Sequence, residues 1–208
     1  MHAGYDATTA LVVVDVQNDF ADPAGSLSVP GGDAIVPYLN GQIAAALAGG
    51  ALVAYTQDWH PPSTPHFAKD GGPWPVHCLA GTWGAALHPA LTADAGPSVR
   101  KGANGEDGYS GFTMRDPDSG DLVATELVGL LRARGVRRVV VCGLATDYCV
   151  RGTALDAVAL GYRTSVLGEG VRAVNLRPGD GAGALAELVD AGVELVEPTV
   201  APAAEPVA

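Results

Sequence analysis

The chain is poor in the residues that mark several classes of protein. Its 208 residues include only three cysteines and two lysines, and its formal net charge is −11. A small, odd number of cysteines argues against a disulfide framework. The shortage of basic residues argues against binding to nucleic acid or to an anionic membrane surface. We therefore expect a reduced, cytoplasmic protein with neither a nucleic-acid nor a membrane partner.

Long apolar runs and targeting signals are also absent from the sequence. No stretch approaches the ~18 apolar residues that a membrane span needs, and the first ten residues do not have the pattern of a signal peptide. The overall hydrophobic content of 48% is enough for one sizeable core. Residues after Glu197 are rich in proline and alanine. We predict a single domain over residues 1–197 and a flexible tail over 198–208.

Short apolar segments alternate with helical ones along the chain. Strands are predicted at 10–16, 51–56, 98–101, 138–142, 163–167 and 193–196. Helices are predicted from a capping Asp33 to about residue 48, over 122–134, from the end of the fourth strand to about 160, and near 182–191 with Asp180 as its cap. The irregular segment 59–97 is expected to cover the edge of the sheet. This alternation predicts an α/β fold, a three-layer α/β/α sandwich with a six-stranded, mainly parallel sheet.

Four reactive side chains fall at the ends of predicted strands, or just past them. They are Asp15, Asp58, Lys101 and Cys149. Ligands of such sheets bind beyond the carboxyl ends of the strands, so we expect these side chains to share one site. A carboxylate such as Asp15, at the end of an apolar strand, is costly unless it is paired or functional. Lys101 is one of two lysines in a chain with ten arginines.

Cys149 lies in the stretch GLATDYC, which connects the fourth strand to a helix. A thiol at the positive end of a helix dipole should have a lowered pKa, which favours the thiolate. Asp15 would then act as its general base, and the Lys101 ammonium would stabilise both anions. The alternative is structural: a buried cysteine that packs as a small hydrophobe, a loop-capping aspartate and a solvated lysine.

A second group of polar residues follows the second predicted strand. It consists of one carboxylate and three of the five histidines of the chain: Asp58, His60, His66 and His77. This combination of ligand types in a short stretch predicts a divalent metal ion. Zinc, iron and manganese all suit such a set, and the spacing does not distinguish them.

Three aromatic residues lie in loops that leave the same end of the sheet. Phe20, Trp74 and Tyr109 could each simply pack in the core, as most aromatic side chains do. Together at one end they would suit a flat, aromatic substrate held by stacking.

Several segments of the sequence, taken in order, resemble the nicotinamidases of the isochorismatase-like hydrolase family. They are VVVDVQNDF with AGSLSVPGG, TQDWHP, WPVHCLAGTWGAALHP, RKGANGEDGYSGF and GLATDYCVRGTALDA, and they span most of the chain from residue 11 to about 175. The cysteine motif is shared by the wider family, whereas DWH together with WPVHC is more specific to nicotinamidases.

This resemblance implies the isochorismatase-like hydrolase fold and hydrolysis of nicotinamide to nicotinate and ammonia, in the salvage of NAD. It implies a catalytic triad of Asp15, Lys101 and Cys149 and a Cys149 thioester intermediate. A cis peptide before Ala145 would aim the backbone amides of Ala145 and Cys149 at an oxyanion.

The resemblance also implies roles for the histidines and the aromatic residues. Asp58, His60 and His77 would hold the metal, with zinc the first candidate, while His66 matches a ligand in only some relatives. The metal would hold the pyridine nitrogen, directly or through its water shell. The ring pocket would be lined by Phe20, Trp74, Tyr109 and Leu144.

Two other functions stay open at this point. Within the family, the chain could hydrolyse another small amide, or an enol ether such as isochorismate, although many of those relatives lack a metal cluster. It could instead be a metalloprotein or small-molecule binding module with an inert Cys149, which the complete Asp/Lys/Cys set argues against. The metal, the use of pyrazinamide and the formation of a homo-oligomer stay undetermined by the sequence.

Overall fold

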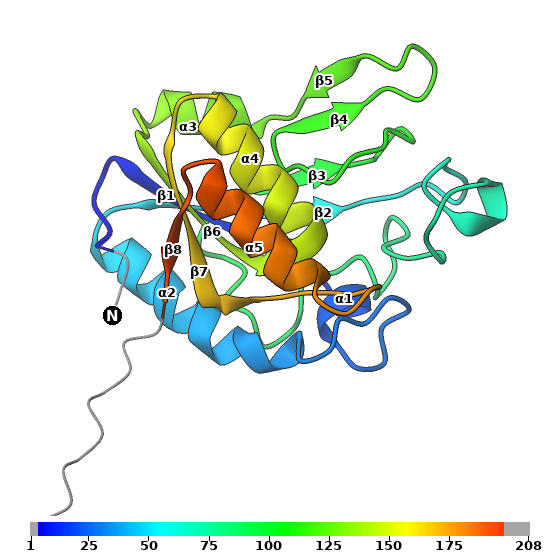
Figure 1. Cartoon of the computed structure of the whole chain (residues 1–208), viewed down its shortest axis with the longest axis horizontal. Helices are drawn as coiled ribbons and strands as arrows, with labels where there is room; N and C mark the ends of the chain where they lie inside the picture. Colours follow the sequence, from blue (N-terminus) through cyan, green and yellow to red (C-terminus); the bar gives the residue numbers. More distant parts are fainter. Residues whose placement is uncertain (1–3, 198–208) are drawn as a thin grey trace, which may run out of the picture.

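The computed structural model describes residues 4–197, and its centre is a parallel sheet (Figure 1). The sheet has six strands in the order β3-β2-β1-β6-β7-β8, and each neighbouring pair is parallel. The strands are β1 (Thr9–Val14), β2 (Leu52–Asp58), β3 (Ser98–Lys101), β6 (Arg138–Leu144), β7 (Arg163–Arg172) and β8 (Glu194–Val196). The predicted six-stranded sheet is therefore confirmed, and it is parallel throughout the described chain.

Helices cover both faces of the sheet, which confirms the three-layer sandwich (Figure 1). One layer contains α2 (Val36–Ala48), and the other contains α3 (Leu127–Ala133), α4 (Arg151–Ala159) and α5 (Asp180–Asp190). Because side chains alternate along a strand, β1 supplies both cores. Leu11 packs in the cluster that contains Leu39 of α2, whereas Val12 packs in the cluster that contains Leu131 of α3. Burial on both faces explains why β1 reads as a continuous apolar run.

The order of the strands reverses between β1 and β6. From β1 the chain adds β2 and β3 on one side, and from β6 it adds β7 and β8 on the other. In sheets of this kind the crevice at the reversal point, beyond the carboxyl ends of the strands, is where ligands bind. Asp15 directly follows β1, and the segment 145–149 directly follows β6.

The helix predicted over 122–134 is wrong in its first part. Residues Leu122–Ala124 form β5, which pairs antiparallel with β4 (Thr113–Arg115) outside the main sheet. The helix begins only at Leu127, whose amide donates a hydrogen bond to the hydroxyl of Thr125 at 3.2 Å. Leu122 is 66% exposed. The apolar residues at the start of the predicted helix therefore do not pack in a core.

The ends of three other elements also differ slightly from the predictions. Asp33 does not cap a helix but begins a 3-10 turn, η1 (Asp33–Ile35), that runs into α2 without a side-chain cap. Asp180 is the first residue of α5, and its carboxylate accepts a hydrogen bond from the amide of Arg177 at 2.8 Å. Strand β7 continues to Arg172 because its pairing with β6 resumes after an irregularity.

The segment 59–97 extends beyond the carboxyl ends of β2 and β3 before it returns along the sheet (Figure 1). Its one helical element is a short 3-10 turn, η2 (Ala68–Asp70), and the rest is irregular. The returning part packs beside α2, where the Asn40 side chain donates a hydrogen bond to the carbonyl of Ala90 at 2.8 Å. The segment therefore lies beyond the carboxyl ends of the strands and does not only cover an edge of the sheet.

The connection between β1 and α2 contains one more short helix, α1 (Asn18–Ala21). Across residues 4–197, every helix falls short of the length and apolarity that crossing a bilayer would require. The predicted tail, 198–208, lies outside the described residues.

Candidate active site

Asp15 is completely buried at the end of β1. Its backbone adopts the left-handed conformation (φ 49°), which aspartate tolerates better than most residues, so the chain turns out of the strand here. One carboxylate oxygen, Oδ1, accepts a hydrogen bond from the Thr56 hydroxyl at 2.6 Å. The other, Oδ2, lies 2.9 Å from Nζ of Lys101. The buried carboxylate is thus both paired with a cation and hydrogen-bonded.

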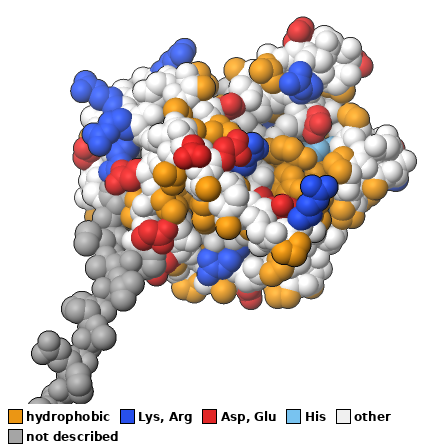
Figure 2. Space-filling model, viewed as in Figure 1, with side chains coloured by type: hydrophobic (Ala, Val, Ile, Leu, Met, Phe, Trp, Pro, Cys, Tyr) orange, Lys and Arg blue, Asp and Glu red, His pale blue; other side chains and the backbone are white. Residues whose placement is uncertain are grey.

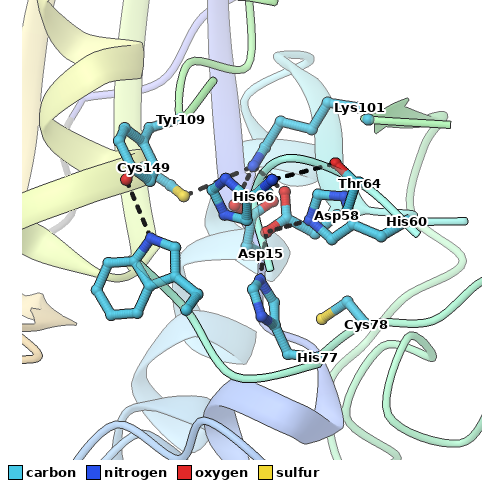
Figure 3. Close-up of polar contacts among 12 residues, drawn as sticks. Asp15, Asp58, His60, Thr64, His66, His77, Cys78, Lys101, Tyr109 and Cys149 are labelled. Atoms are coloured by element: carbon cyan, nitrogen blue, oxygen red, sulfur yellow. Dashed lines mark hydrogen bonds and ion pairs between the residues drawn. The ribbon is translucent and has the colours of Figure 1, made fainter. Parts of the chain in front are cut away.

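Lys101, the last residue of β3, is buried with its ammonium at the centre of the site (Figure 3). Besides Asp15, the ammonium pairs closely with Oδ1 of Asp58 and donates a hydrogen bond to Sγ of Cys149 at 3.5 Å. Its three protons therefore face two carboxylates and one thiol. The structure brings all four side chains from the ends of the predicted strands together.

Cys149 lies in a π-helical turn, η3 (Thr146–Val150), between β6 and α4. The prediction that its pKa is lowered is wrong: burial raises the pKa of the Cys149 thiol well above its usual value. The negative charges of Asp15 and Asp58 add to this effect, and Lys101 only partly opposes it. A helix terminus contributes about 1 kcal/mol, which is less than the cost of placing a charge in a fully buried site. Burial and the two carboxylates therefore favour the thiol form of Cys149 over the thiolate.

The two buried carboxylates have different acidities. Burial, together with the nearby charge of Asp58, raises the pKa of Asp15 despite the opposing effect of Lys101. Burial acts on Asp58 as well, but Lys101 and the imidazoles of His60 and His77 outweigh it and hold the pKa of Asp58 well below its usual range. Asp58 is thus a permanent anion, whereas Asp15 is the carboxyl suited to taking and returning a proton.

The turn before Cys149 adopts the conformation that the resemblance implied, because the Leu144–Ala145 peptide bond is cis. Gly143 precedes it with φ 112°, and a Cβ at this position would lie 2.1 Å from the carbonyl oxygen of Val14. Only glycine therefore allows β6 to approach β1 so closely at the site. Leu144 and Ala145 are both buried.

The three predicted histidine ligands lie together beside this cluster (Figure 3). His60, His66 and His77 are buried, and each offers a ring nitrogen within 4.8 Å of the others. The second oxygen of Asp58, Oδ2, lies 3.6 Å from Nε2 of His60 and 3.7 Å from Nε2 of His77. Such separations are compatible with donors that surround a single small cation.

The hydrogen bonds of these histidines test whether the set fits a metal. Neither ring nitrogen of His60 has a hydrogen-bond partner in the described chain, although buried polar atoms normally have one. Nδ1 of His77 lies 2.7 Å from the carbonyl oxygen of Pro75, and Nδ1 of His66 lies 2.6 Å from a carboxylate oxygen of Asp107. Such outer contacts are typical of histidines that bind metals. The residues present therefore fit a divalent metal ion.

A pocket lies directly above Cys149, and its walls are mainly apolar. All four residues predicted to contact the substrate line it: Phe20, Trp74, Tyr109 and Leu144. Cys149, Asp58 and two of the histidines also line it. In Figure 2, hydrophobic side chains gather beyond the carboxyl ends of the strands, next to a visible histidine. A thiol, a carboxylate and two imidazoles therefore line a pocket whose walls are otherwise mainly apolar.

The sequence analysis did not identify several residues of this pocket. They are Leu27, Val29, Tyr148 and Val174. Tyr148 packs its ring against Trp74 with centroids 4.8 Å apart, and its position next to Cys149 could have indicated it. The three aliphatic residues lie in loops, where nothing distinguishes a pocket residue from a core residue.

Gln17 is a further residue that the sequence analysis did not identify. Its side chain binds the backbone of Asp58 at both ends: Oε1 accepts from the Asp58 amide at 2.8 Å, and Nε2 donates to the Asp58 carbonyl at 2.7 Å. A glutamine immediately after a buried strand was the available signal. Gln17 thereby fixes the position of Asp58, whose carboxylate contacts Lys101 on one side and the histidines on the other.

Among known protein families, the isochorismatase domain matches residues 9–198. The chain belongs to the isochorismatase family. The nicotinamidase of Escherichia coli (strain K12) is 41% identical over 203 residues, which cover 89% of this chain and 93% of that relative. The predicted resemblance to the nicotinamidases of this family is therefore confirmed.

Solved structures of other family members support the same relationship. The pyrazinamidase of Pyrococcus horikoshii, in complex with zinc, has a TM-score of 0.80 at 40% identity, covering 91% of this chain and 99% of that one. PnC1 from L. infantum, in complex with nicotinate, has a TM-score of 0.83 at 38% identity, covering 95% of this chain and 96% of that one.

Proposed function

We propose that the protein is an amidohydrolase that converts nicotinamide to nicotinate and ammonia through a thioester on Cys149. The observation that carries this proposal is the position of Cys149. Its thiol lies within 4.8 Å of a carboxylate oxygen of Asp15 and accepts a hydrogen bond from the buried ammonium of Lys101, and it lines a pocket that also includes aromatic side chains. The names of the relatives agree with this chemistry, since one is a nicotinamidase and a similar structure contains nicotinate.

In the first step, the Cys149 sulfur attacks the carboxamide carbon of the substrate, and the thiol proton passes to Asp15. Because burial raises the pKa of Cys149, we propose that the proton leaves during the attack rather than before it. The raised pKa of Asp15 makes this carboxylate a better base than an exposed aspartate. Lys101 stabilises the negative charge as it moves between the two groups.

The tetrahedral intermediate then collapses. Asp15 returns the proton to the leaving nitrogen, the C–N bond breaks and ammonia departs, which leaves a thioester on Cys149. A water molecule gives a proton to Asp15 as it attacks the thioester, and the sulfur leaves and regains that proton. Backbone amides of Ala145 and Cys149 are proposed to receive the oxyanion, and losing one such donor typically costs about 3 kcal/mol of activation free energy.

The pocket supplies the orientation of the ring. Phe20, Trp74 and Tyr109 would hold a planar ring by stacking and edge contacts. A divalent metal ion, for which zinc is the first candidate, would be held by Asp58, His60, His66 and His77 and would orient the ring through the pyridine nitrogen. Asp58 stays anionic beside Lys101, so it can serve both the ammonium and a cation in the histidine cluster.

The cellular setting follows from the chemistry. The described cysteines are free and buried, which suits a reducing compartment. We propose that residues 1–197 act as a single domain in the cytoplasm, in the salvage of NAD.

Release of ammonia from nicotinamide tests the proposal directly. Purified protein is mixed with nicotinamide, with and without a chelator, and both ammonia and nicotinate are measured. We expect equal amounts of the two products, and a lower rate after chelation that added zinc restores. No ammonia under either condition would contradict the proposal and would favour a family member that acts on another small amide or on an enol ether.

A further inference from the structure

The three histidines of the candidate metal site differ in the partners of their ring nitrogens. His77 contacts a neutral backbone carbonyl, that of Pro75, whereas His66 contacts a carboxylate, that of Asp107. The ring nitrogens of His60 have no hydrogen-bond partner within the described residues, and Nε2 lies 3.6 Å from the Asp58 carboxylate. Within the described residues, His66 is therefore the one histidine of the three whose ring is paired with a carboxylate other than that of Asp58.

Asp107 is anchored to the neighbouring strand through its backbone. Its backbone amide donates a hydrogen bond to the carbonyl of Arg115 at 2.9 Å, which ties it to strand β4. The backbone of His66 is fixed separately, because its amide lies 3.3 Å from the Thr64 hydroxyl oxygen. Two segments 41 residues apart in the sequence thus meet through this side-chain contact, beside which the Thr64 hydroxyl donates a hydrogen bond to the Gly105 carbonyl at 3.4 Å. The carboxylate is 48% exposed while the imidazole is 4% exposed, so Asp107 contacts the buried ring from the surface.

The contact decides which nitrogen of His66 is free. A carboxylate can only accept a hydrogen bond, so Nδ1 of the neutral ring carries the proton. Nε2 is then the only nitrogen of His66 with a lone pair for a cation. Carboxylate–histidine pairs of this kind orient metal-binding rings and increase their basicity.

We infer that Asp107 is a positioning residue that makes His66 the third imidazole ligand of the metal site. The inference rests on the metal site of the proposed function but not on the identity of the substrate. It predicts that metal affinity, and not only activity, depends on a carboxylate that lies outside the pocket.

Zinc binding to the metal-free full-length protein tests this inference. Wild type, Asp107→Ala and Asp107→Asn are titrated with Zn²⁺ against a chromophoric chelator. We expect Asp107→Ala to raise the Kd by about 10- to 100-fold. Asp107→Asn keeps an oxygen acceptor for Nδ1 and should lie between Asp107→Ala and wild type.

Asp118 provides the matched control. It is an exposed carboxylate in the same β4–β5 hairpin, so Asp118→Ala removes the same charge without touching a histidine. Nitrogen NMR shifts of His66 in the metal-free protein provide a second readout, because the Nδ1–H form should lose its preference in Asp107→Ala alone. An equal loss of zinc affinity in Asp118→Ala would overturn the inference, as would an unchanged Kd in a folded Asp107→Ala variant.

The outcomes also separate this inference from the proposed function. A wild type that hydrolyses nicotinamide but does not bind zinc would overturn the role of Asp107 and leave the amidase proposal standing. A protein that binds zinc in an Asp107-dependent manner but releases no ammonia would support the role of Asp107 and contradict the proposed substrate.

Discussion

The two halves of the site are built in different ways. The thiol cluster, which we define as Asp15, Lys101 and Cys149, comes from β1, β3 and the turn after β6. The histidine cluster, defined as His60, His66 and His77, comes entirely from the irregular segment between β2 and β3. Hydrogen bonds of the sheet position the first cluster, whereas separate side-chain and loop contacts position the second.

The two clusters also differ in how completely they are satisfied. In the thiol cluster, one ammonium faces two carboxylates and a thiol, so its buried charges are paired within the protein. In the histidine cluster, the ring nitrogens of His60 have no hydrogen-bond partner within residues 4–197. The thiol cluster should therefore form without a metal, whereas the histidine cluster should need one to be stable. Lys101 connects the two through Asp58.

Replacing the nucleophile should have the largest effect on activity. Cys149→Ala removes the group that forms the thioester, so we expect nicotinamide hydrolysis to fall on the order of 10⁴-fold or more. Zinc affinity should stay at the wild-type value, because the histidine cluster is built from other elements. The control is Cys142→Ala, which alters a cysteine buried in β6 away from the pocket. Near-normal activity of Cys149→Ala would refute the mechanism.

Removing the connecting cation should have the largest effect on stability. Lys101→Met leaves Asp15 and Asp58 buried without their cation, so we expect a loss of about 3–5 kcal/mol in the free energy of unfolding, measured in urea. Lys69 pairs with Asp70 at the surface with 45% of its side chain exposed, and Lys69→Met should cost about 0–1 kcal/mol. If both variants lost the same stability, the central place of Lys101 would be disproved.

Metal loading should act on the histidine cluster alone. At a free zinc concentration 100 times the Kd, binding should stabilise the folded protein by about 2.7 kcal/mol. This appears as a rise in Tm between chelated and zinc-loaded samples. His60→Ala should abolish most of that rise, because it removes the imidazole whose ring nitrogens have no hydrogen-bond partner in the described part of the chain. An equal rise in wild type and His60→Ala would place the metal elsewhere.

The smallest expected effect concerns the aromatic wall. Trp74 Nε1 donates a hydrogen bond to the Tyr109 hydroxyl at 3.0 Å, and Tyr109→Phe deletes the acceptor. We expect an increase in KM for nicotinamide equivalent to about 0.5–1.5 kcal/mol, with a smaller change in kcat. Tyr162→Phe is the control, since Tyr162 packs against Phe112 and does not line the pocket. A fall in kcat alone would indicate that Tyr109 acts on the chemical step instead.

The difference between the two clusters also explains which site residues could be predicted from the sequence. Asp15, Lys101 and Cys149 could be placed together because short apolar strands are visible in the sequence, and parallel strands end at one side of a sheet. The strand at 122–124 was mistaken for part of a helix, because its apolar spacing fits both structures and only the pairing with β4 decides between them. Gln17 and Asp107 were not identified, because their roles depend on contacts with Asp58 and His66, which are distant in the sequence.

The turn around Cys149 shows where prediction from the sequence ends. Its residues alone indicated Cys149 as the candidate nucleophile, with Gly143 before it and a helix after it, because these features depend on local propensities. The acidity of the thiol was decided only by the tertiary structure. The helix end favours a thiolate by a small amount, but burial and the two carboxylates from β1 and β2 favour the thiol more strongly. Burial and the charges of distant segments are properties of the folded chain. The sequence therefore determined which residues are candidates for the chemistry, and only the fold decided which protonation state they favour.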